Sequence, residues 1–135
     1  MKSLTSEEKM REAEKEVKRL LDDEDLKRLS DREKDQIAQF YEQKSTNRME
    51  TAALIFSHSS DAKNKQSTEA SKEYADYGEV VAASYYAMYY IVHGYLAKKY
   101  SMKLREELRG VHAITHKLVL YYLVKTNQIA THLYD

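Results

Sequence analysis

Two arginines and two histidines recur at a regular spacing in the last third of this 135-residue chain. Arg105 precedes His112 by seven positions, and Arg109 precedes His116 by the same interval. Histidine exchanges protons near neutral pH, and the guanidinium fork of arginine matches the oxygens of a phosphate group. Residues of these two types could carry acid–base chemistry on a phosphate-containing substrate, so all four are candidate catalytic residues.

The spacing places each arginine near its histidine if the segment is helical. Seven residues make about two turns of an α-helix, or about 10 Å along its axis, so the members of a pair share one face. Arg109 and His112 are three positions apart and also share a face. The spacing does not decide which of the two pairs matters.

A second interpretation of the two histidines is a metal site, since histidines four positions apart on a helix can chelate zinc. Ala113 stands where zinc proteases carry a glutamate, and the chain has no cysteine. A third ligand would have to come from a distant segment, so we expect no metal and no other cofactor. The remaining histidines, His58, His93 and His132, have no partner pattern and are expected to be structural.

The composition favours one domain of long helices. Proline and cysteine are absent and glycine occurs three times, so helix breakers are rare and disulfides are excluded. The 22 basic and 22 acidic residues balance, which gives no general reason to expect nucleic-acid or membrane binding. From Lys98 to Lys125, however, seven basic residues stand against two acidic ones. No secretory signal or membrane-spanning run is visible, so we expect a cytoplasmic protein.

The first half of the chain is expected to form two helices. A capping box at residues 5–8 opens the first helix, and an acidic cluster predicts a break over residues 22–30. A second capping box at residues 30–33 opens the next helix, which we expect to loosen over its polar middle, residues 43–48. Residues 57–71 are rich in Ser, Lys, Asn, Asp and Gln and predict a solvated connection, either mobile or partly helical.

A long helix is expected from Tyr77 to Lys99. Apolar and aromatic residues surround nearly its whole circumference, so neighbouring helices or a second subunit must cover it on several sides. Tyrosine is its dominant aromatic residue, which suits half-buried positions because the hydroxyl group needs a partner.

The last part of the chain is expected to hold a basic connection at residues 101–108 and a helix over residues 109–125. Asn127 is its expected C-cap, and residues 128–135 read as the start of another apolar element. We therefore predict an all-α fold, an up-and-down bundle of four to five helices in which residues 1–135 form a single domain.

Two segments of the second half resemble the HEPN (higher eukaryote and prokaryote nucleotide-binding) family. The run SYYAMYY at residues 84–90 is similar to the central helix of small archaeal and bacterial HEPN proteins. The run VHAITH at residues 111–116 is similar to the start of the next helix in that family, where an arginine and a histidine are separated by four to six residues. The resemblance covers roughly residues 77–124.

This resemblance implies a metal-independent endoribonuclease or toxin. Such family members cleave RNA by attack of the ribose 2′-hydroxyl on its own phosphate, which requires a proton-transferring group and a permanent cation. His112 or His116 would be the acid–base residue, and Arg109 or Arg105 would be the phosphate clamp. In the family these residues meet at a dimer cleft, so the resemblance implies a homodimer, an RNA substrate and a minimal nucleotidyltransferase antitoxin as partners.

The alternative is an inactive HEPN module that serves dimerisation or binds protein or nucleotide. Active family members usually have a polar residue such as Asn, Asp or His directly after the arginine, whereas Gly110 and Glu106 stand there in this chain. A third interpretation is a helical scaffold unrelated to HEPN. The tyrosines of residues 77–99 could also stack on RNA bases, although on so apolar a helix we expect core and interface positions.

Overall fold

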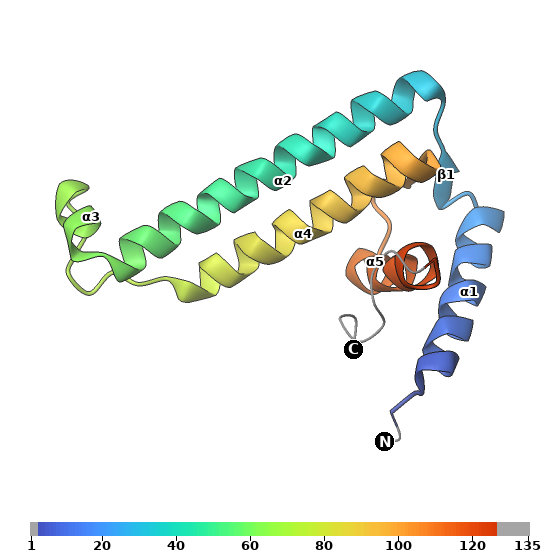
Figure 1. The fold of residues 1–135 in the computed structure, drawn as a ribbon, viewed down its shortest axis with the longest axis horizontal. Helices are drawn as coiled ribbons and strands as arrows, with labels where there is room; N and C mark the ends of the chain where they lie inside the picture. Colours follow the sequence, from blue (N-terminus) through green and yellow to red (C-terminus); the bar gives the residue numbers. More distant parts are fainter. Residues whose placement is uncertain (1–2, 127–135) are drawn as a thin grey trace. The chain divides into compact units, whose positions relative to one another are not determined.

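The computed structural model describes residues 3–126, most of which are helical (Figure 1). The elements in chain order are α1 (Ser6–Asp22), β1 (Leu26–Arg28), α2 (Asp31–Ser60), α3 (Ala62–Ser67), α4 (Tyr77–Tyr100), β2 (Met102–Leu104), α5 (Val111–Val119) and the π-helical turn η1 (Leu120–Val124). The prediction of an all-α helical bundle is confirmed. The predictions for Asn127, residues 128–135 and His132 lie outside the described residues.

The chain forms two compact units. The hairpin unit contains α2, α3 and α4, which are continuous in sequence from residue 31 to residue 100. The terminal unit contains the elements before and after it: α1, β1, β2, α5 and η1. The hairpin unit is therefore an insertion between two sequence segments that fold together.

In the hairpin unit, α2 and α4 run antiparallel and side by side (Figure 1). The buried residues of α2 recur every seven positions and are all small: Ala38, Ser45, Ala52 and Ser59. The buried hydroxyl of Ser45 donates a hydrogen bond of 2.8 Å to the backbone carbonyl of Ala87 on α4. A stripe of small side chains lets two helices pack closely together. Here the packing is close enough for Ser45 of α2 to reach the backbone of α4.

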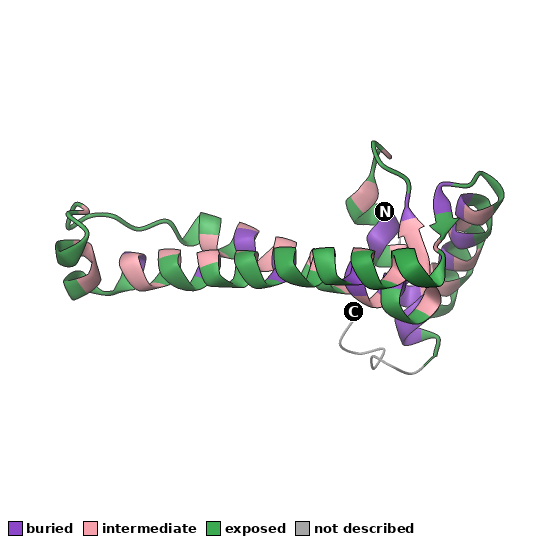
Figure 2. Ribbon diagram, turned by 90° about the horizontal axis from the view of Figure 1, so that it is seen from above, coloured by how far each residue is buried: buried purple, intermediate pink, exposed green. Residues whose placement is uncertain are grey.

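Large apolar side chains remain exposed on other faces of the hairpin, which is mostly exposed or half-buried along its length (Figure 2). Val81 and Met88 of α4 are 69% and 60% exposed, and Leu54 of α2 is 62% exposed. Within this unit α2 thus covers one side of α4 only. The tyrosines of α4 after its first residue are half-buried, as the sequence predicted, whereas Tyr77 is 49% exposed.

The loosening expected over residues 43–48 is wrong, and the partly helical connection expected over residues 57–71 begins later than predicted. The polar middle of α2 does not loosen, because the helix is continuous to Ser60 and Gln43 Nε2 donates to Asn47 Oδ1 one turn later at 3.0 Å. The solvated connection expected from residue 57 therefore starts later. It contains the short helix α3, whose first turn is capped by Asp61, which accepts a hydrogen bond from the backbone N–H of Lys63.

At Gly94, α4 passes close to the backbone of α2. A Cβ atom at Gly94 would lie 3.3 Å from Tyr41 Cβ and 3.5 Å from the carbonyl oxygen of Ala38. We expect Gly94→Leu to force the helices apart and to lower the free energy of unfolding by about 1–3 kcal/mol, as overpacking does in close-packed interiors.

Urea denaturation followed by circular dichroism measures this effect. Gly78→Leu is the matched control, because a Cβ atom at Gly78 meets only the Asp76 carboxylate, at 3.8 Å. Gly94→Ala should be close to neutral, since the gain in helix propensity of about 1 kcal/mol offsets a small displacement. Equal losses at Gly94→Leu and Gly78→Leu would contradict the close approach.

In the terminal unit, α1 begins at the predicted capping box. Thr5 Oγ1 accepts a hydrogen bond of 3.2 Å from the backbone N–H of Glu8, whose carboxylate accepts one of 2.8 Å from the N–H of Thr5. The helix packs on α5 and η1 through its buried residues Ala13, Val17 and Leu20. It ends at Asp22, where the acidic cluster predicted a break.

A two-stranded antiparallel ladder joins the two halves of the terminal unit, and the sequence did not predict it. Leu26 of β1 lies opposite Leu104 of β2, and both side chains are buried. The expected connection at residues 101–108 therefore contains a strand. Each strand has three residues, which is too short for a period-two pattern to be recognised.

The helix predicted over residues 109–125 begins later and changes its winding. Gly110 is its N-cap with φ +71°, a left-handed conformation that glycine adopts readily, so α5 begins at Val111. Ile114 and Leu118 of this helix are buried. After Val119 the helix continues as the π-helical turn η1, which ends as Lys125 N–H donates to the carbonyl of Leu120 at 2.9 Å.

Candidate catalytic groove

The two candidate histidines project from the exposed face of α5. His112 and His116 are exposed and one helical turn apart, whereas Ile114 and Leu118 on the opposite side are buried. Side chains four positions apart lie on the same face of a helix. The structure therefore brings His112 and His116 together, as the sequence pattern predicted.

An open groove of about 470 Å³ lies along this face. Its lining residues come from α1 and from α5 with η1: Lys9, Glu12, His112, Ala113, His116, Lys117 and Leu120. Two imidazoles, two ammonium groups and one carboxylate thus share one concave surface. A volume of this size is within the range of about 300–1,000 Å³ that is typical of small-molecule sites.

Sequence reasoning missed three of these polar residues, Lys9, Glu12 and Lys117. Lys117 directly follows His116, and this adjacency is the one signal that could have found it. Lys9 and Glu12 belong to the charged side of α1, where nothing in the local pattern distinguishes them from other surface charges. They enter the groove because the apolar stripe of α1 packs against α5 and η1.

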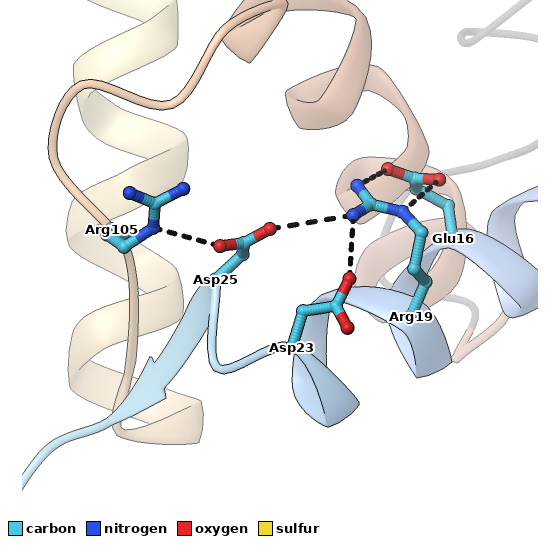
Figure 3. A network of polar contacts seen from close by, with 5 residues as sticks. All are labelled: Glu16, Arg19, Asp23, Asp25 and Arg105. Carbon is cyan, nitrogen blue, oxygen red and sulfur yellow. Dashed lines mark hydrogen bonds and ion pairs between the residues drawn. The ribbon is translucent and has the colours of Figure 1, made fainter.

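Arg105 does not line the groove, and its expected two-turn relation to His112 is wrong. It lies outside α5, directly after β2, so no continuous helix connects the two residues. Its Nε atom donates to the carboxylate of Asp25 at 2.9 Å, and its backbone N–H donates to the Asp25 carbonyl at 2.6 Å. Figure 3 shows Asp25 between Arg105 and Arg19.

Asp25 belongs to a network that fixes the end of α1 to the strands. Asp25 is 8% exposed, and its second carboxylate oxygen is 3.5 Å from Arg19 Nη1. Arg19 also pairs with Glu16 at 2.6 Å and Asp23 at 3.1 Å, and its hydrogen bond lowers the pKa of Glu16 (Figure 3). A buried carboxylate requires such partners, so Arg105 acts here as a structural cation.

Arg109 lies in the turn that precedes α5 and is exposed. Because α5 begins at Val111, the helical relation expected between Arg109 and both histidines does not form. Arg109 does not line the groove, but it is separated from the first residue of α5 by Gly110 alone. The backbone amides in the first turn of a helix have no partner within the helix and give its N-terminal end a partial positive charge. Arg109 adds a further positive charge at this end of α5.

No cluster of three or more His, Cys, Asp or Glu side chains that could hold a metal ion occurs within residues 3–126. In the same part of the chain, no helix is long and apolar enough to cross a membrane. Comparison of the chain with models of protein families, with curated proteins and with solved structures finds no match.

Proposed function

We propose that this chain is a HEPN-type endoribonuclease that cleaves RNA without a metal ion. The observation that carries the proposal is the pairing of His112 and His116 on one exposed face, in a groove that also contains Lys9 and Lys117. The sequence resemblance of residues 77–124 to HEPN proteins supports the same chemistry.

The groove offers the groups that this reaction needs. One imidazole accepts the proton of the ribose 2′-hydroxyl as the 2′-oxygen forms a bond to phosphorus. The bond from phosphorus to the 5′-oxygen breaks, and the other imidazole, in its protonated form, gives a proton to that leaving oxygen. Lys9, Lys117 and the neighbouring Arg109 supply positive charge for the phosphorane.

Two copies of the chain are expected to act together. Arg105 is occupied by Asp25 and Arg109 does not line the groove, so neither candidate arginine of one protomer is among the groove-lining residues of the described chain. The resemblance implies a dimer cleft, and the exposed apolar residues Val81 and Met88 of α4 supply surface for such an interface. A minimal nucleotidyltransferase antitoxin is part of the same proposal.

Incubation with a mixed-sequence single-stranded RNA in EDTA tests the proposal. We expect fragments with 2′,3′-cyclic phosphate and 5′-hydroxyl ends, because the 2′-hydroxyl is the nucleophile. A DNA strand of the same sequence lacks this group and should stay intact, which tests whether the 2′-hydroxyl is the nucleophile, and His112→Ala purified in the same way controls for contaminating ribonucleases. Intact RNA across several sequences would leave no support for cleavage by this groove.

An inactive HEPN module for dimerisation or for binding protein or nucleotide is the second candidate. The structural role of Arg105 favours it, because a pair that contains Arg105 and His112 cannot serve catalysis while Asp25 holds the guanidinium group. It predicts that the chain dimerises and leaves every RNA intact.

A further inference from the structure

We infer that the groove recognises a base as well as a phosphate, and that Glu12 selects guanine beside the scissile phosphate. This inference rests on the proposed function for the identity of the substrate. It concerns the groove-lining residues that acid–base chemistry does not use: the carboxylate of Glu12 and the apolar side chains of Ala113 and Leu120.

Glu12 is the one carboxylate among the groove-lining residues of the described chain. It is exposed and takes part in no ion pair within residues 3–126, although Lys9 lies three positions before it on the same helix. A carboxylate repels a polyanion, so its presence in a groove that also contains Lys9 and Lys117 opposes binding of phosphate alone. Its charge instead suits a ligand group that donates hydrogen bonds.

Guanine offers the best match to a carboxylate. The N1–H and N2–H groups on its Watson–Crick edge are adjacent donors, and both oxygens of Glu12 can accept from them as a charge-assisted bidentate pair. Cytosine and adenine each present one amino group next to a ring nitrogen acceptor. Uracil presents one N–H between two carbonyl oxygens, which a carboxylate repels.

The remaining lining residues leave room for this arrangement. Ala113 and Leu120 form an apolar part of the groove on which the flat face of a base can lie. Lys117 follows His116 on α5 and Lys9 lies on α1, so positive charge is available from both helices for the phosphate of the same nucleotide. Base, ribose and phosphate would thus each meet a different group of residues.

Binding of the four 3′-nucleoside monophosphates, measured by isothermal titration calorimetry, tests the inference without any cleavage. We expect 3′-GMP to bind about tenfold or more tightly than 3′-UMP, which is the discrimination that one bidentate contact provides. Glu12→Gln should remove most of this preference, because an amide cannot accept two hydrogen bonds with its two terminal atoms. Lys9→Ala should weaken the binding of all four nucleotides by a similar factor.

Glu50→Gln on α2 is the matched control, because Glu50 is exposed, belongs to the hairpin unit and should leave all four affinities unchanged. Equal affinities for the four nucleotides in the wild-type protein, no binding at all, or a guanine preference that survives Glu12→Gln would each overturn the inference. If 3′-GMP binds through Glu12 while RNA stays intact, base recognition stands and the ribonuclease proposal fails.

Discussion

Alanine in place of His112 or of His116 is expected to slow RNA cleavage by a factor of about 10²–10⁴, which corresponds to about 3–5 kcal/mol in the activation free energy. Each imidazole moves a different proton of one reaction, so the loss of either interrupts the same step. The double variant should be little slower than each single variant, since residues that act as a unit are not additive. Single-turnover cleavage of a labelled RNA measures all three rates.

The arginines provide the contrast for this experiment. Arg105→Ala should lower stability, because it removes a partner of buried Asp25, and the folded fraction should keep its cleavage rate. Arg109→Ala should reduce the rate of RNA cleavage and leave the midpoint of the unfolding transition unchanged. Full activity in His112→Ala and in His116→Ala, with intact folding, would exclude this groove as the catalytic site.

The second large effect is a dependence of stability on pH that originates at His93. This residue of α4 is 4% exposed, and burial lowers its pKa to about 4. The centre of its imidazole ring lies 4.5 Å from the ring centre of Tyr89 and 5.7 Å from that of Tyr41. The unfolded chain has an ordinary histidine with a pKa of about 6.5. Between these values the unfolded state binds a proton that the folded state does not, so stability falls as pH falls from about 6.5 to about 4.

The loss attributable to His93 should reach about 3 kcal/mol at the acidic end of this window. Urea denaturation at several pH values measures it as the difference between the wild-type protein and His93→Gln, which should show the shallower dependence. His58→Gln, at a half-buried position of α2, is the control for replacing a histidine by glutamine elsewhere in the hairpin unit. Parallel curves for wild type and His93→Gln would show that this imidazole is not held neutral by burial.

The sequence predicted those elements whose signals are local. The capping box of Thr5 and Glu8 and the continuous apolar and aromatic run of α4 each depend on residues within a few turns of one another. The placement of His112 and His116 on one face was predictable for the same reason. A spacing of four positions is sufficient once the segment is helical.

The features that were missed depend on residues far apart in the chain. The Arg105–Asp25 pair joins residues 80 positions apart, and neither residue has a neighbour that signals it. The regular spacing of Arg105 and His112 suggested a helix, but the left-handed conformation of Gly110 and the pairing of Leu104 with Leu26 separate the two residues. Lys9 and Glu12 could not be assigned to the groove, because only the packing of α1 on α5 brings them there.

The ladder between β1 and β2 has a consequence for the order in which the protein folds. Pairing Leu26 with Leu104 and bonding Leu29 N–H to the Ser101 carbonyl at 2.7 Å closes a loop that contains the entire hairpin unit. In a disordered chain, closure of a loop of about 70 residues costs roughly 4 kcal/mol in entropy. The antiparallel α2–α4 pair holds residues 31 and 100 at the same end, so a chain in which this pair forms first has already met most of that entropic cost. The inserted hairpin thus brings together the two chain segments that form the groove, although none of its own side chains lines the groove.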